Sequence, residues 1–374
     1  MQNEKILLAS PHMCGEEMKY IQLAFDTNWV APLGANVTGL ENDICTYTGA
    51  EYAVALSSGT AALHLALIDA GVRAGDKVFC QSLTFSASTN PIVYLGAEPV
   101  FIDSERETWN IDPAALRKAI SLYGVPKAVM LVHLYGTPAK LDEIIAICKE
   151  YGITLIEDAA EALGSFRHGQ SCGTFGTYSA LSFNGNKIIT TSGGGMLLCR
   201  TEAAAKHALK LATQAREPAP WYQHTEIGYN YRMSNICAGI GRGQMEVLEQ
   251  RVAKKREIFE NYRAAFADLP VSWAEEDDAT RANRWLSVLL LDEDCGVTPT
   301  QLLDTLNAEN IEGRHMWKPM HMQPVFADYP IVCAEDTCVC EQLFLHGVCL
   351  PSDTKMTADQ QSRVIATVRS LFHV

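Results

Sequence analysis

Residues 128–158, AVMLVHLYGTPAKLDEIIAICKEYGITLIED, contain two β-rich apolar runs separated by one helical pattern. The runs Ala128–His133 and Thr154–Asp158 have the length and composition of buried strands, and Lys140–Tyr151 has the pattern of a helix. A strand, a helix and a second strand in this order form a right-handed βαβ unit with parallel strands. The segment therefore predicts an α/β fold built on a parallel sheet covered on both faces.

The same alternation extends from about residue 50 to residue 200. The connection from Phe183 to Gly195 is too short and too glycine-rich for a crossover helix, so its two flanking strands should pair antiparallel. The prediction is a mixed, mostly parallel sheet of seven strands. The five further strands are expected at Tyr52–Ser57, Lys77–Gln81, Glu98–Asp103, Tyr178–Phe183 and Gly195–Cys199, with helices at Thr60–Ala70 and Asp112–Leu122.

The rest of the chain predicts a second, smaller unit. One long helical pattern covers about Asn235 to Phe266, and the composition changes beyond Pro270. We place a domain boundary inside that helix, which predicts a large domain at 1–250 and a smaller C-terminal α+β domain at 251–374. Other elements are expected near Glu202–Thr213 (helix), Leu286–Leu291 (strand), Thr300–Glu309 (helix) and Ala358–Phe372 (helix).

Composition limits the class of protein. The formal net charge of −14 over 374 residues argues against a nucleic-acid partner and an anionic membrane, because both favour basic surfaces. The twelve cysteines include no CxxC pair, and Cys338 with Cys340 lacks the second ligand pair that a zinc site needs. Scattered thiols are typical of a reducing cytoplasm, and no stretch has the form of a signal peptide or a membrane span. We expect a soluble cytoplasmic protein without a bound metal.

The first motif is Ser57-Ser58-Gly59-Thr60, between a predicted strand and a predicted helix. Small residues at a helix N-terminus let backbone N–H groups surround an anion, and hydroxyls add further donors. The alternative is an ordinary N-cap with nothing bound. The sequence has no GxGxxG and no GxxxxGK[ST], so it supports neither a dinucleotide site nor a P-loop.

The second motif is Leu155-Ile156-Glu157-Asp158-Ala159-Ala160. Its two carboxylates end a central strand, at the edge where open α/β sheets bind ligands. A buried carboxylate there could keep a heteroaromatic nitrogen protonated. The alternative is that Asp158 only caps the next helix.

The third motif is the loop Ser182-Phe183-Asn184-Gly185-Asn186-Lys187, followed by Ser192-Gly193-Gly194-Gly195. A loop lysine is usually a solvated charge, but beside a phosphate and an electron-poor carbonyl its amine can form a Schiff base. A phosphate anchor, a pyridinium partner and a lysine are what a protein supplies to pyridoxal phosphate. The three motifs together therefore predict that cofactor.

These motifs also carry a family resemblance. The sequence resembles the DegT/DnrJ/StrS family of nucleotide-sugar aminotransferases, which has the aspartate-aminotransferase fold (pyridoxal-phosphate fold type I). The most specific segments are Ser58-Gly59-Thr60-Ala61-Ala62, Glu157-Asp158-Ala159-Ala160-Glu161 and Ser182 to Lys187. The likeness runs from Trp29-Val30-Ala31-Pro32-Leu33-Gly34 to His321-Met322-Gln323-Pro324.

The resemblance implies a role for each matching residue. Lys187 would hold the cofactor covalently, and Asp158 would pair with its ring nitrogen. Asn235 would reach the cofactor of a partner subunit, which implies a homodimer with shared active sites. The alternatives are core packing for Phe85 and a helix N-cap for Asn235. The remaining cofactor contacts would come from Ser58, Gly59, Thr60, Phe85, Glu161 and Ser182.

The resemblance also implies the reaction. Some relatives carry histidine in place of the lysine and are dehydratases, so Lys187 favours transamination, with glutamate as donor in a ping-pong cycle. The segments Lys187–Gly195 and Trp317–His321 resemble the members that aminate UDP-4-keto-6-deoxy-N-acetylglucosamine on the way to bacillosamine-type sugars. Two alternatives remain: another pyridoxal-phosphate enzyme (a sugar dehydratase or an amino-acid lyase), and a non-catalytic regulator that kept the fold.

A nucleotide sugar carries a diphosphate, which an acidic protein must bind through local cations. The segment 313–321 concentrates cationic and aromatic side chains that could meet phosphate oxygens and the sugar or base. The alternative is a loop that only packs between domains. The candidate substrate contacts are Arg314, His315, Trp317, Lys318 and His321, with Arg232 and Glu161 as further candidates.

Overall fold

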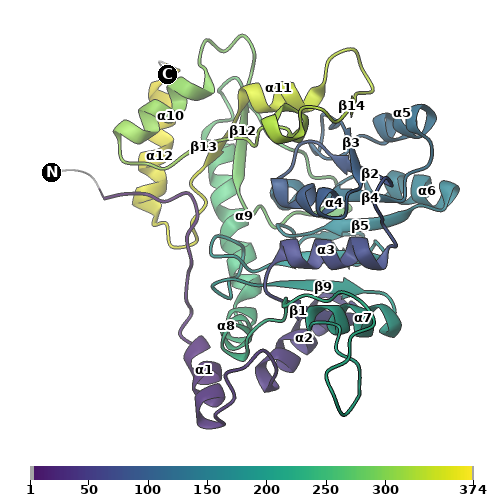
Figure 1. The fold of residues 1–374 in the computed structure, drawn as a ribbon. Helices are drawn as coiled ribbons and strands as arrows, with labels where there is room; N and C mark the ends of the chain where they lie inside the picture. Colours follow the sequence, from purple (N-terminus) through teal and green to yellow (C-terminus); the bar gives the residue numbers. More distant parts are fainter. Residues whose placement is uncertain (1–3, 373–374) are drawn as a thin grey trace.

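The computed structural model describes residues 4–372, and its centre is a sheet of eight strands (Figure 1). Seven of these are the predicted strands, with bounds within one residue of those expected. In sheet order the strands are β1 (Tyr52–Leu56), β9 (Gly195–Cys199), β8 (Tyr178–Ser182), β5 (Thr154–Asp158), β4 (Ala128–Val132), β2 (Lys77–Gln81), β3 (Glu98–Ile102) and β14 (Ile331–Val332).

The sheet is mixed, as predicted. β9 runs antiparallel to both of its neighbours, β1 and β8, and the other pairs are parallel. The predicted count of seven strands is one too low, because β14 pairs with β3. A two-residue strand has no detectable alternation, and tertiary packing alone brings residue 331 beside residue 101.

Helices cover both faces of this sheet because side chains alternate along each strand. Leu155 of β5 packs into the apolar core beneath one set of helices, and its neighbour Ile156 packs into the core beneath the other. The first set is α2 (Ala35–Thr48), α5 (Pro113–Tyr123) and α6 (Leu141–Tyr151), and the second is α3 (Gly59–Asp69), α4 (Asn90–Tyr94) and α7 (Glu202–Ala212).

The helix predicted from Asn235 to Phe266 is two helices, α8 (Asn235–Met245) and α9 (Leu248–Ala265), with a break at Glu246 and Val247. α8 packs against α1 (Glu17–Asp26), and a Cβ atom on Gly243 would lie 2.6 Å from the Glu17 Cα. Glu246 then contacts Lys19 and Tyr20 of α1. The sequence pattern runs through this break without a signal. The break lies where Glu246 contacts α1, which is distant in sequence.

The smaller unit has an antiparallel sheet of four short strands with helices packed beside it (Figure 1). Its apolar core is formed by side chains of that sheet and those helices. Its buried residues include Tyr262, Leu289 and Val364. The strands are β10 (Val271–Ser272), β12 (Ser287–Leu291), β15 (Gly347–Leu350) and β13 (Arg314–His315), and the helices are α9, α10 (Pro299–Ala308) and α12 (Ala358–Ser370). α11 (Val339–His346) packs against β12.

The division into two domains near residue 250 remains a prediction. The outer ends of the two predicted domains, residues 1–3 and 373–374, lie outside the described residues. Segments cross this division in both directions. Ile6 packs into the C-terminal core and bridges to Ile311, while β14 joins the large sheet. A third small sheet pairs β6 (Phe166–Arg167) with β7 (Gln170–Ser171) and with β11 (Thr280–Arg281).

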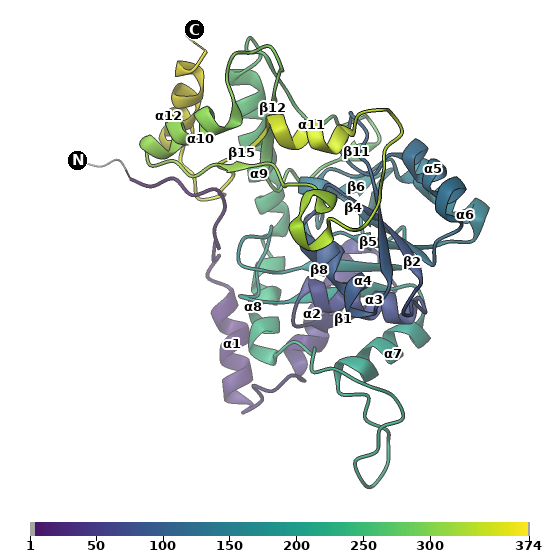
Figure 2. The same cartoon turned by 45° about the horizontal axis from the view of Figure 1, so that its top comes forward.

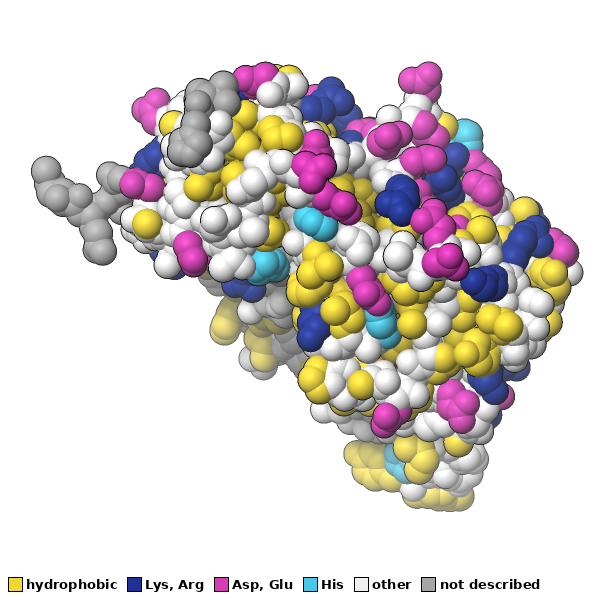
Figure 3. Space-filling view, turned by 90° about the horizontal axis from the view of Figure 1, so that it is seen from above, with side chains coloured by type: hydrophobic (Ala, Val, Ile, Leu, Met, Phe, Trp, Pro, Cys, Tyr) yellow, Lys and Arg dark blue, Asp and Glu magenta, His cyan; other side chains and the backbone are white. Residues whose placement is uncertain are grey.

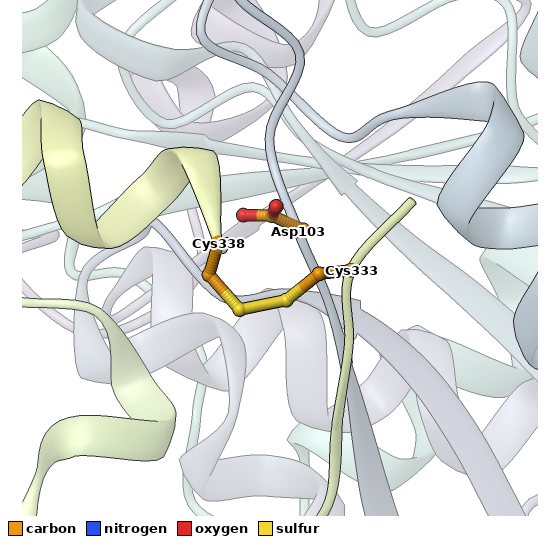
Figure 4. A group of neighbouring side chains, drawn as sticks. All are labelled: Asp103, Cys333 and Cys338. Carbon is orange, nitrogen blue, oxygen red and sulfur yellow. A yellow bond between two sulfur atoms is a disulfide. The ribbon is translucent and has the colours of Figure 1, made fainter. Parts of the chain in front are cut away.

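The cysteines differ from expectation at one place. Ten are free, but Cys333 and Cys338 form a disulfide that closes the turn before α11 (Figure 4). Asp103 lies beside them, and within residues 4–372 these three form the one group with metal-ligand atoms close together. The Asp103 carboxylate accepts the backbone N–H groups of Val339 and Cys340, and the two sulfurs are bonded to each other. These partners explain the cluster without a metal ion.

The described surface carries charges of both signs. Acidic and basic side chains are interspersed on the face seen from above (Figure 3). No helix within residues 4–372 combines the length and the apolar content needed to cross a membrane.

Candidate active site

A cavity of about 560 Å³ lies at the carboxyl ends of β1, β2, β4, β5 and β8. This is the edge at which open α/β sheets bind ligands, and the volume suits a small molecule. The cavity brings together eleven of the predicted site residues, which come from both parts of the chain. They are Ser58, Gly59, Thr60, Phe85, Asp158, Glu161, Ser182, Lys187, Arg314, His315 and Trp317.

The turn from β1 into α3 places the N-terminus of a helix in the wall of the cavity. The Ser58 hydroxyl accepts the N–H of Ala61 and caps α3, so the N-cap reading of that hydroxyl is right. The N–H groups of a first helical turn have no partner within the helix and can bind an anion. A Cβ atom at Gly195 would lie 2.4 Å from the Gly59 nitrogen, so only glycine lets β9 pack against this turn.

The two carboxylates of the second motif have different environments. Asp158 lines the cavity, accepts a hydrogen bond of 2.6 Å from the Ser88 hydroxyl, and is buried, which raises its pKa. Glu157 does not line the cavity, because neighbouring side chains on a strand point to opposite faces. It accepts N–H groups from Gly173 and Phe175 and lies 2.9 Å from His133.

Lys187 is not a solvated charge. Its side chain is 12% exposed, and its Nζ lies 3.3 Å from Glu161 Oε1 and 4.1 Å from the centre of the Trp285 ring. Glu161 is also buried, and burial raises its pKa to about 7 although the charge of Lys187 acts in the opposite direction. An amine and a carboxyl group therefore lie within hydrogen-bonding distance of each other in the cavity.

Aromatic rings form one wall of the cavity. Phe85 is 57% exposed and lies 5.5 Å from Trp317, measured between ring centres, so it is not a core residue. Trp317 in turn packs against Tyr135, and its backbone N–H donates to the Tyr135 hydroxyl. This arrangement gives a planar ligand an aromatic face.

Two further polar side chains of the site lie on β13. Arg314 and His315 are exposed and line the cavity, and Arg314 Nη2 lies 3.1 Å from Glu312 Oε1. Glu312 is also tied to the backbone N–H of Leu8. An anion entering the cavity would meet Arg314, at the cost of a partly exposed ion pair that is weak in water.

Four predicted site residues do not line the cavity: Arg232, Asn235, Lys318 and His321. Arg232 pairs with Glu41 at 2.6 Å and donates to the backbone carbonyl of Ala55. His321 lies 2.7 Å from the Ser82 hydroxyl and 3.0 Å from Glu341. Lys318 is half-buried.

Asn235 has a structural task in its own subunit. Its side chain accepts the N–H groups of Asn36 and Val37 at the start of α2 and donates to the carbonyl of Trp29. Ser234, not Asn235, caps α8. The alternative that Asn235 is a helix N-cap is therefore wrong for α8, and its side chain instead binds the N-terminus of α2.

Three residues at the site escaped the sequence analysis: Ser88, Tyr135 and Trp285. Tyr135 follows β4 at the ligand-binding edge of the sheet, and that position could have identified it. Trp285 comes from the C-terminal part of the chain, 98 residues after Lys187, and only the tertiary fold brings it to the cavity. The Ser88 hydroxyl donates a hydrogen bond to Asp158, and no sequence motif marks Ser88.

The residues of the cavity fit pyridoxal phosphate. The glycine-lined turn before α3 suits a phosphate, Asp158 suits a protonated ring nitrogen, Phe85 suits the ring face, and Lys187 can supply the amine. Each group lies on a different element, so the match depends on the fold as well as the motifs.

Comparisons with known proteins identify the family. Residues 11–369 match the model of the DegT/DnrJ/EryC1/StrS aminotransferase family. EpsN of Bacillus subtilis, named as a candidate pyridoxal phosphate-dependent aminotransferase, is 52% identical, covering 99% of this chain and 97% of that protein. GDP-perosamine synthase of Caulobacter vibrioides is 34% identical, covering 97% of each chain.

A solved structure extends the likeness to three dimensions. A DegT DnrJ EryC1 StrS aminotransferase from Brucella abortus superposes with a TM-score of 0.88 at 26% identity, covering 96% of each chain. The fold is thus that of the pyridoxal-phosphate aminotransferases of this family, and the cofactor is pyridoxal phosphate. The chain belongs to the DegT/DnrJ/EryC1/StrS aminotransferase family.

Proposed function

We propose that the protein transfers the amino group of glutamate to a nucleotide-linked keto sugar. The proposed substrate is UDP-4-keto-6-deoxy-N-acetylglucosamine, which would receive the amino group at its C4 keto carbon. The observation that carries the proposal is the convergence of Lys187, Glu161 and Asp158 in a cavity whose opening bears Arg314 and His315. The name of the 34% identical GDP-perosamine synthase supports a nucleotide-linked sugar and makes a GDP-linked sugar the second candidate.

The residues of the cavity divide the work. Bound pyridoxal phosphate supplies an electron-poor ring that stabilises negative charge on the carbon next to the transferred nitrogen. Lys187 takes the proton from that carbon, and Glu161, 3.3 Å away, stabilises the ammonium group that results. Asp158 keeps the ring nitrogen protonated. Glutamate and the keto sugar must reach the same Lys187 amine, so they use the cavity in turn, in a ping-pong cycle.

The opening of the cavity would bind the nucleotide part of the sugar. Arg314 and His315 can meet diphosphate oxygens, and Trp317 offers a ring to the sugar or the base. The weak Arg314–Glu312 pair can open for this without a large loss of stability.

We also propose a homodimer with shared active sites. A set of apolar side chains on α1 and the segment after it is exposed, and contiguous apolar surface marks interaction sites. The segment between α7 and α8 extends away from the body (Figures 1 and 2). It exposes further large apolar side chains. The exposed residues are Met18, Leu23, Phe25, Trp29, Val30 and Leu33, with Trp221, Tyr222 and Ile227 on the second segment.

The ten free cysteines support a reducing, cytoplasmic setting.

A substrate panel tests the proposed function. UDP-, GDP- and dTDP-linked keto sugars are each incubated with the holoenzyme and glutamate, and 2-oxoglutarate and amino sugar are quantified, with Lys187→Ala as control. We expect equal amounts of the two products, with the UDP-linked 4-keto sugar as the best substrate. A sugar dehydratase would consume the sugar without forming amino sugar, and an amino-acid lyase or a regulator would convert none of the sugars.

A further inference from the structure

Trp285 contacts the Lys187 loop through two different parts of its side chain. The face of its ring lies under the Lys187 Nζ at 4.1 Å, and its indole N–H donates to the backbone carbonyl of Asn186 at 2.8 Å. The ring is 2% exposed and stacks on Tyr135. A buried ring face attracts a cation more strongly than an exposed one, because water does not compete for the charge.

Glu161 contacts the same amine from another direction. Its Oε1 lies 3.3 Å from Nζ, and its Oε2 accepts the backbone N–H of Tyr135 at 2.7 Å. That hydrogen bond orients the carboxylate toward the lysine. Asp158 lines the same cavity, and the charge of Lys187 favours its ionised form, although burial raises the pKa of Asp158.

The loop that carries Trp285 is itself held against the Glu161 turn. Asn283 donates to the carbonyl oxygens of Glu161 and Leu163 and accepts the backbone N–H of Trp285. The ring and the carboxylate, which come from different parts of the chain, therefore keep a constant separation around the amine.

We propose that Trp285 and Glu161 form a resting site for the protonated Lys187 amine during the half of the cycle in which the amine is not attached to the cofactor. Trp285 is a positioning residue that acts through Lys187. This inference rests on the proposed role of Lys187 as the attachment residue. The site keeps the ammonium group in the cavity and gives it partners other than Asp158 and the cofactor phosphate, so it stays ready for the next proton transfer.

Chemical labelling of Lys187 tests the resting site without measuring activity. The full-length protein is loaded with pyridoxamine phosphate, which leaves Lys187 free, and is treated at one fixed pH with a limiting amount of acetic anhydride. Peptide mass spectrometry then compares acetylation of Lys187 with that of the exposed Lys149 in the same molecules. A caged ammonium reacts slowly, and a released amine reacts faster.

The variants separate the ring face from the indole N–H. We expect Trp285→Leu to raise relative labelling of Lys187 roughly fivefold through loss of the cation–π contact. Glu161→Gln should raise it about tenfold through loss of the opposite charge. Trp285→Phe keeps an aromatic face but loses the bond to Asn186, and we expect a rise of less than about twofold.

Two results would overturn the inference. In the first, Trp285→Phe behaves like Trp285→Leu, which would mean that the bond to Asn186 carries the effect. In the second, Glu161→Gln leaves labelling of Lys187 unchanged. The Glu161→Gln variant therefore tests the resting site even if Trp285→Leu does not fold. Failure of the sugar panel with this labelling pattern intact would reject only the proposed substrate, whereas covalent attachment at a lysine other than Lys187 would reject the basis of both proposals.

Discussion

Lys187 shows how far a local pattern can be interpreted at the scale of one residue. The motif predicts that it holds the cofactor, and the structure places its Nζ in the cavity, 3.3 Å from Glu161. We expect Lys187→Ala to fold but to lose covalent attachment of pyridoxal phosphate and transamination. Borohydride reduction followed by peptide mass spectrometry checks this, with thermal melting as the control for folding. Reducible cofactor on another lysine would show that the assignment is wrong.

Substitutions of the neighbours Glu157 and Asp158 should have different effects, one on stability and the other on catalysis. Asp158→Asn should keep the fold and lower kcat at least about a hundredfold, because ring-nitrogen protonation is lost. Glu157→Ala should lower the free energy of unfolding by roughly 3–5 kcal/mol, because it leaves the N–H groups of Gly173 and Phe175 and the His133 ring buried without their acceptor. Urea denaturation and steady-state kinetics on both variants separate the two losses. Equal stability with equal loss of activity would contradict the opposite orientations of these side chains.

Glu161 should make the stability of the cofactor-free protein depend on pH. Burial raises its folded pKa to about 7 from an ordinary value of 4.5. The contribution of Glu161 to the free energy of unfolding is therefore fully present below pH 4.5 and is lost as pH rises through 7. The loss amounts to roughly 3 kcal/mol at most. Urea denaturation at about pH 5 and pH 8 should show this decline in the wild type and a smaller one in Glu161→Gln. The same slope in both would mean that Glu161 does not titrate in this range.

At the scale of the element, β13 brings Arg314 and His315 to the cavity although it is only two residues long. We expect Arg314→Ala to raise the KM for the nucleotide sugar about tenfold, the loss of one charge-assisted hydrogen bond, with kcat nearly unchanged. Arg281→Ala is the matched control, since Arg281 is also ion-paired on a two-residue strand but does not line the cavity. Similar KM values in both variants would remove Arg314 from the binding site.

The elements themselves were predictable where a period extends over enough residues. All seven long strands of the large sheet and the antiparallel return to β9 follow from local pattern. β14 and the break between α8 and α9 did not, because a two-residue strand carries no alternation and because the break accompanies contacts of Glu246 with the distant α1. Tertiary contacts override weak local preferences at such places.

At the scale of the whole molecule, the shared-site dimer leads to a complementation test. In the segment Tyr229–Asn235, Asn230 is exposed whereas Asn235 is buried and bonded within its own subunit. Asn230 is therefore the better candidate to reach a partner's cofactor. If Asn230→Ala alone is inactive, mixing it with Lys187→Ala should restore about a quarter of the activity, since half of randomly formed dimers are mixed and each has one intact site.

Asn235→Ala tests the sequence-based assignment in the same way. Because Asn235 holds the start of α2, we expect this variant to lose stability, by about 1 kcal/mol or more for the capping contact. Restoration by Asn235→Ala with Lys187→Ala, but not by Asn230→Ala, would favour the original assignment. No restoration in either mixture, with subunit exchange confirmed, would contradict shared sites.

The sequence by itself determined the seven long strands of the large sheet, and it predicted that the turn before α3, Asp158 and Lys187 belong to one site. Each of these signals depends on neighbours in the chain. Backbone conformation, alternation along a strand and capping act over a few residues and leave a local signal. The tertiary structure alone decided that Trp285 and Arg314 meet Lys187 in one cavity, and that Arg232, Asn235 and His321 have structural partners elsewhere. Those contacts join residues far apart in sequence, so they depend on how the smaller C-terminal part packs on the large sheet.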